Sequence, residues 1–147
     1  MITILSREQV FTALFSHLQA NAALAAGFKT FSRKLTHMSK VTAEDCPALF
    51  MEHSGEMTAV ITRQPSKWVL ELNLWIYTKT ENQAVGPILN PLLDLVEKAL
   101  APPVNGEYVQ TLGGLVAHCW IEGQTQIFEG NLGDEAIAII PVKILVT

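Results

Sequence analysis

The hydrophobic pattern along the chain has two different periods. Val10, Leu14 and Leu18 recur at every fourth position, which is typical of a helix with one buried face. Between Trp68 and Ile76, large apolar residues recur at every second position, which is typical of a strand with one buried face. The chain therefore contains both helices and strands, and their apolar faces must pack against one another.

Two helix starts can be predicted from capping residues. Ser6 and Gln9 have the spacing of a capping box, in which each side chain binds an unpaired amide at the start of a helix. Asn90 is suited to the N-cap of a second helix, with Pro91 at the first helical position. The prolines at 102–103 prevent this second helix from continuing.

Six segments have the composition and period of strands. They are 28–35, Ala48–His53, 68–78, Leu115–Glu122, 125–129 and Ala136–Val146. We predict that Ser54-Gly55 ends the second strand and that Gly123 joins the fourth and fifth in a hairpin. The order of helix, strands, helix and strands predicts an α+β fold. We expect a single domain over residues 1–147, with two main helices packed on a largely antiparallel or mixed β-sheet.

Composition adds a first indication of function. The 147 residues are 49% apolar and only 16% charged, against about 25% charged residues in an average soluble domain. A surface with so little charge favours a subunit of an assembly.

Met1 to Leu5 lead directly into polar residues, and no apolar run approaches the roughly 20 residues of a membrane span. We therefore expect neither a signal peptide nor a membrane segment.

Charge is distributed unevenly along the chain. Residues 1–67 hold seven Lys/Arg and five Asp/Glu, whereas residues 68–147 hold three and nine, and the net charge of −4 gives no general case for nucleic-acid recognition. The basic residues cluster between positions 29 and 40. This cluster is either a solvated surface or a positive patch that meets an acidic neighbour in a multimer. The cluster consists of Lys29, Arg33, Lys34 and Lys40.

The second half of the chain supplies the other candidate interface residues. Trp75 and Tyr77 lie on the more polar face of the strand at 68–78. Either a helix or loop of the same chain covers them, or they contact a partner, since aromatic residues are enriched at interfaces. Glu122, Glu129 and Asp134 are the acidic residues that we expect to face a basic neighbour.

Catalytic and metal-binding patterns are missing from the sequence. Cys46, His53, His118 and Cys119 lack the close-pair spacings of zinc ligands. His118 and Cys119 are consecutive in a predicted strand, so their side chains point to opposite faces, and Cys119 is expected to be buried and inert. The two cysteines are too few for a disulfide framework. We therefore expect no catalytic residues, no cofactor and no metal site.

The sequence as a whole resembles the tail-completion proteins of long-tailed phages and prophages, of the tail terminator (minor tail protein U) type. The resemblance spans most of the chain and keeps the order of its elements. The matching segments are Phe28–Leu35, Pro47–Phe50, Lys67–Thr80, Asn90–Asp94 and Gly113–Gly123.

The resemblance implies a structural, non-catalytic virion protein that is assembled in the host cytoplasm. Such a subunit forms a sixfold ring on the end of the tail tube, stops its polymerisation and provides the attachment surface for the head. Its implied partners are other copies of itself, the tail tube protein and a head-completion protein, without nucleic-acid sequence recognition or membrane contact. The alternatives are another neck, head–tail joining or tube component, a small-molecule-binding domain or minor enzyme, or a bacterial protein that reuses this fold in a contractile injection machine.

Overall fold

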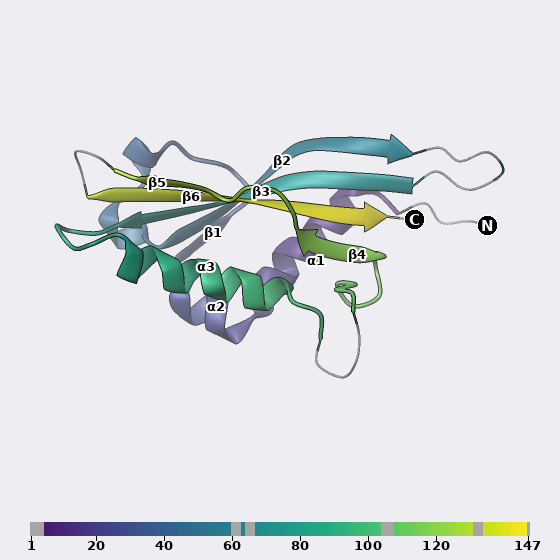
Figure 1. Ribbon diagram of the computed structural model, residues 1–147, viewed down its shortest axis with the longest axis horizontal. Helices are drawn as coiled ribbons and strands as arrows, with labels where there is room; N and C mark the ends of the chain where they lie inside the picture. The colour runs from purple at the N-terminus through teal and green to yellow at the C-terminus, as the bar shows by residue number, and fades with distance from the viewer. Residues whose placement is uncertain (1–4, 60–62, 64–66, 104–107, 131–133, 147) are drawn as a thin grey trace.

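A six-stranded sheet forms the centre of the molecule, and three α-helices pack on one of its faces (Figure 1). The computed structural model describes residues 5–59, 63, 67–103, 108–130 and 134–146. The helices are α1 (Arg7–Ala20), α2 (Ala22–Gly27) and α3 (Gly86–Leu100), and two 3-10 turns are η1 (Met38–Lys40) and η2 (Ala43–Asp45). The strands are β1 (Thr30–Ser32), β2 (Ala48–Ala59), β3 (Lys67–Lys79), β4 (His118–Ile121), β5 (Gln126–Glu129) and β6 (Glu135–Val146).

The sheet is mixed, and its two edges come from distant parts of the sequence. The strand order is β1-β2-β3-β6-β4, and β5 also pairs with β6. β1 runs parallel to β2, whereas all other pairs are antiparallel. The predicted α+β fold with a mixed sheet is therefore confirmed, with a short third helix in addition to the two main ones.

The main core lies between the helices and one face of the sheet. Side chains at alternate positions of β3 and β6 point toward the helices and are buried, as the period of 2 predicted. They meet the apolar stripe of α1, where the capping box is confirmed: Ser6 Oγ accepts from Gln9 N at 3.1 Å and Gln9 Oε1 accepts from Ser6 N at 2.8 Å. The core includes Val10, Leu14, Leu18, Leu70, Leu72, Leu74, Ile76, Val96, Ile140, Val142 and Ile144.

The predicted start of the second main helix is wrong. Helix α3 begins at Gly86, with Pro87 in its first turn, so that Asn90 and Pro91 lie inside the helix. The proline that starts the helix is Pro87, since a missing amide has no consequence in the first turn. The earlier start also lets Leu89 join the buried face. The predicted end is confirmed, because α3 stops at Leu100.

The first two strands differ in length from their predictions. The strand predicted at 28–35 is only Thr30–Ser32, because Lys34 N donates to Ser32 Oγ at 3.0 Å and the chain turns there. The second strand runs to Ala59 and does not end at Ser54-Gly55. A bulge between His53 and Gly55 absorbs one residue, and pairing with β3 continues beyond it.

The predicted hairpin across Gly123 is also wrong. β4 and β5 pair with successive parts of β6 and therefore form one interrupted edge strand. The interruption lies opposite Pro141, which has no amide to donate. Gly123 has a φ of 112°, and a Cβ at this position would lie 3.3 Å from Pro141 Cγ. Gly123 thus lets the strand pass the proline ring.

A second, smaller core lies on the other face of the sheet. The segment that follows β1 crosses one end of this face and brings both 3-10 turns onto it (Figure 1). This segment, residues 35–46, covers part of this face of the sheet. The buried side chains are Met38, Val41, Cys46, Ala48, Phe50 and Tyr77.

Candidate assembly interfaces

The remainder of this second face is only partly covered by the described residues. We call it the open face. Its side chains are mostly of intermediate exposure, and they mix aromatic, aliphatic and charged groups. Aromatic residues are enriched at protein interfaces, so this face is a candidate contact surface. The open face consists of Val69, Glu71, Asn73, Trp75, His118, Trp120, Gln126, Phe128, Ile139, Pro141, Lys143 and Leu145.

The two aromatic residues that the sequence placed on one strand face have different environments. Tyr77 is 3% exposed, and its hydroxyl donates to the Thr36 carbonyl at 2.8 Å. It packs on Phe50 with ring centroids 5.1 Å apart. Tyr77 therefore belongs to the interior, covered by a loop of its own chain. Trp75 lies at the border of the open face and is half-buried, with Nε1 donating to Glu52 Oε1 at 3.3 Å.

A second aromatic pair lies on the open face near the sheet edge. His118 and Trp120 stack with centroids 4.9 Å apart and ring planes at 10°. Trp120 Nε1 donates to Glu122 Oε1 at 3.3 Å, and Lys143 Nζ lies 2.6 Å from Glu122 Oε2. The hydrogen bond from Lys143 lowers the pKa of Glu122. Trp120 was not among the interface residues predicted from the sequence, although its spacing of two from His118 places both side chains on one face.

The basic cluster lies at the β1 edge of the sheet. Lys29, Arg33, Lys34 and Lys40 are all exposed. Arg33 is paired within the chain, since its Nη2 lies 2.6 Å from Glu8 Oε1. The same contact lowers the pKa of Glu8. Glu44 and Asp45 of η2 are also exposed and follow Lys40 closely in sequence. The positive charge of this edge is therefore concentrated in Lys29, Arg33 and Lys34, beside β1.

The acidic candidates lie at or near the opposite edge. Glu122 follows β4 and Glu129 ends β5, and both are exposed. Asp134 is exposed too, but its Oδ1 accepts from Asn82 N at 2.9 Å and its carbonyl accepts from Thr80 N at 2.6 Å. Asp134 therefore holds the segment that follows β3, residues 80–82, beside the start of β6. The basic cluster of the first half of the chain and the acidic candidates of the second half thus lie at or near opposite edges of the sheet.

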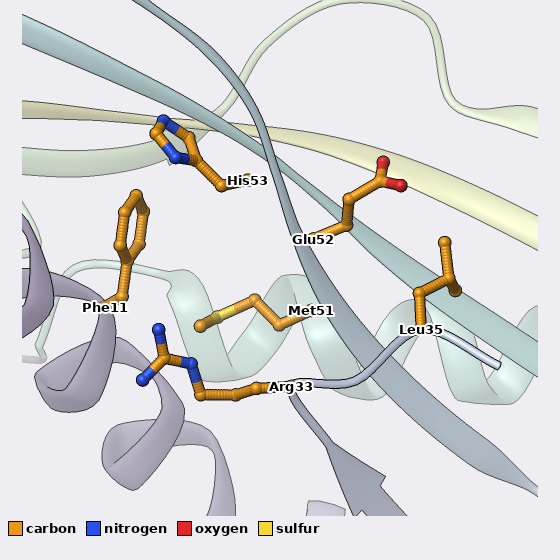
Figure 2. Close-up of a pocket in the computed structure, with 6 residues that line it drawn as sticks. All are labelled: Phe11, Arg33, Leu35, Met51, Glu52 and His53. Atoms are coloured by element: carbon orange, nitrogen blue, oxygen red, sulfur yellow. The ribbon is translucent and has the colours of Figure 1, made fainter.

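Two hollows flank these edges. One, of about 300 Å³, lies where β1 ends beside β2 (Figure 2). The other, of about 420 Å³, lies between α3 and the β4–β5 edge, with Asp94 and Glu97 among its lining residues. The first hollow is lined by Phe11, Arg33, Leu35, Met51, Glu52 and His53. Within the described ranges, no group of three or more His, Cys, Asp or Glu could hold a metal ion.

Both cysteines are expected to resist a thiol reagent in the folded protein at pH 8. Cys46 and Cys119 are buried, and burial raises the pKa of the Cys119 thiol to about 12. Since the thiolate is the reactive form, this shift and the lack of access both slow the reaction. Absorbance after addition of Ellman's reagent measures the reaction, with urea-unfolded protein as the control. Rapid reaction of Cys119 in the native state would contradict its position in the core.

The fold of the chain is similar to that of a chain in a virion. None of the described helices is long and apolar enough to cross a membrane. No protein-family model and no curated protein sequence matches the chain. Matches exist among solved structures. One is a chain of the "Virion of native gene transfer agent (GTA) particle", with 13% sequence identity, 92% coverage of each chain and a TM-score of 0.58. At this identity the likeness shows a shared fold.

Proposed function

We propose that the protein is a structural subunit of a phage or prophage tail that assembles as a ring, hexameric as in the proteins it resembles. The ring caps the tail tube, stops its polymerisation and presents the surface to which the head attaches. The tail tube protein and a head-completion protein are its partners. We propose no catalytic role, cofactor or metal for it.

The observation that carries this proposal is the fold shared with a virion chain. The likeness covers 92% of both chains, so it extends over the whole architecture and not over one common motif. The sequence resemblance to tail terminators points to the same kind of particle independently of the fold. Together they favour a virion protein. We propose that it is assembled in the host cytoplasm, as the resemblance to tail terminators implies.

The placement of charge supports assembly into a ring. In a ring, one patch of each subunit meets a different patch on the next. Here the basic residues beside β1 and the acidic residues at the β4–β5 edge lie on opposite edges of one sheet. Each subunit can therefore present a basic edge to the acidic edge of its neighbour. The part of the open face around Trp75 and Trp120 then remains available for the tube or the head.

A second candidate is a head–tail joining or tube component. The shared fold with a chain of the gene transfer agent virion favours a virion protein without indicating its position in the particle. A joining protein would also assemble as a ring and would need the same two edges. Particle morphology separates these roles.

Deletion of the gene from the phage or prophage that carries it tests the proposal. We expect abnormally long tails without heads in negative-stain electron microscopy, because nothing would stop the tube. A plasmid copy of the gene should restore normal length. Tails of normal length without heads would indicate a joining protein instead, and normal infectious virions would contradict a structural role altogether.

A further inference from the structure

Strand β5 leaves an unusual amount of apolar surface in water. All four of its residues are exposed, and Ile127 and Phe128 are 48% and 54% exposed. Its pairing with β6 occupies one side of the strand, and no described residue pairs with the other side. An exposed apolar edge strand readily pairs with another chain. The free side of β5 is therefore a candidate site for pairing with another chain.

A matching site lies at the opposite edge of the sheet. β1 covers only Ala48–Phe50 of β2, so that from Met51 onward one side of β2 has no pairing partner among the described residues. The hollow of about 300 Å³ lies at this notch. Figure 2 shows Phe11, Met51 and Arg33 on one side of β2 and Leu35 on the other.

We propose that β5 of one copy pairs with the free edge of β2 in the next copy, at the notch where β1 ends. The inference rests on the ring assembly proposed above and names its contact. It joins the exposed apolar strand β5 to a hollow that is lined by apolar side chains together with Arg33, His53 and Glu52. The sheets of neighbouring subunits become continuous around the ring.

Strand direction is compatible with this contact. β2 and β6 are both antiparallel to β3 and therefore run in the same direction. β5 is antiparallel to β6. When neighbouring copies keep their strands in the same direction, β5 thus meets β2 as an antiparallel partner, which is the more stable arrangement per residue. The bulge after His53 limits the pairing to a few residues, which matches the short length of β5.

The alternation of side chains fits the two sides of the notch. Ile127 and Glu129 pair with residues of β6 that face the helices, so they point to the helix side of the sheet. If the sheet continues into the neighbouring subunit, the helix side of the neighbour's notch holds Phe11 and Arg33. Ile127 thereby meets Phe11, and Glu129 meets the guanidinium of Arg33, whose Nη2 also pairs with Glu8 within its own chain. Phe128 points to the other side, toward the neighbour's Leu35.

Crosslinking in assembled particles tests the contact. The double variant Leu35→Cys with Phe128→Cys, supplied as the gene copy of the phage or prophage, places one new thiol on each side of the proposed contact. Treatment of purified particles with a short bismaleimide should produce a ladder of covalent oligomers on a denaturing gel. The two native cysteines are buried, so wild-type particles serve as the blank.

The two single variants are the controls that test whether the crosslinks join the two proposed patches. Neither Leu35→Cys nor Phe128→Cys alone should crosslink, because the contact joins two different patches. Dimers from Phe128→Cys alone would reveal two β5 edges meeting each other and would overturn the proposal. Particles that contain the double variant but give no ladder would overturn it too, while leaving the ring intact. Absence of the wild-type protein from particles would remove the proposed function, and this contact with it.

A second pair of variants checks the energetic role of the strand. Phe128→Ser should reduce incorporation into particles by roughly tenfold, since burial of one aromatic side chain at an interface contributes about 1.4 kcal/mol or more. Tyr108→Ser is the matched control, because Tyr108 is 90% exposed and lies outside the proposed contact. Quantitative immunoblots of purified particles measure both. Equal incorporation of the two variants would contradict a contact through β5.

Discussion

Tyr77→Ser is expected to lower the free energy of unfolding by about 3–5 kcal/mol, the usual loss when a buried aromatic side chain is truncated. The side chain is 3% exposed and packs on Phe50. Its removal also leaves the Thr36 carbonyl without the hydrogen bond that it accepts at 2.8 Å. Urea denaturation followed by circular dichroism measures the change.

Trp75→Ser is the paired variant and should behave differently. Trp75 is half-buried at the border of the open face, so its truncation should cost about 1–2 kcal/mol and leave the protein folded. If the open face contacts the tube or head, this variant fails in particle assembly without unfolding. An equal loss of stability in both variants would show that Trp75 is also a core residue. Tyr77→Phe, which keeps the ring, should lose only about 1 kcal/mol.

The difference between these neighbours shows where prediction from sequence ends. Alternation along the strand correctly placed Trp75 and Tyr77 on one face of the sheet. Which part of that face is covered depends on residues 35–46, which are distant in sequence and reach only one end of it. Local periodicity defines a face, whereas a nonlocal segment decides its exposure.

The other elements follow the same rule. The capping box at Ser6 and the long strands β3 and β6 were predicted because their signals lie within the element itself. The hairpin across Gly123 was wrong because the cause of the strand break, Pro141, lies in the partner strand. Likewise, the bulge in β2 is defined by its register with β3.

The sequence predicts which candidate interface residues carry charge, but it does not predict where they lie on the folded protein. The sequence shows a basic first half and an acidic second half. Only the strand order places β1 at one edge of the sheet and β4 and β5 at the other. Arg33 and Asp134 also have partners within the chain, Glu8 and Asn82, that no spacing pattern indicates. The exposure of Ile127 and Phe128 was not predicted, because the pattern of residues 125–129 is that of an ordinary strand.

Reversal of Arg33 and Lys34 to Glu is expected to reduce infectious particles by roughly tenfold or more. In the proposed ring, these residues face the acidic edge of the next subunit, and like charges placed opposite one another at an interface cost several kcal/mol. Each 1.4 kcal/mol corresponds to a tenfold change in association. Plaque titres and tail lengths in electron micrographs measure the effect.

Two controls separate this interface effect from other consequences of the reversal. Lys67→Glu with Lys98→Glu changes the net charge equally at exposed positions outside the basic cluster, and titres should stay near wild type. Glu8→Gln removes the charge that pairs with Arg33 at 2.6 Å and reports the effect of losing that contact alone. Normal capping by the Arg33→Glu, Lys34→Glu protein would show that the basic edge does not contact a neighbour. A similar defect in the Lys67, Lys98 control would attribute the loss to net charge and not to the edge.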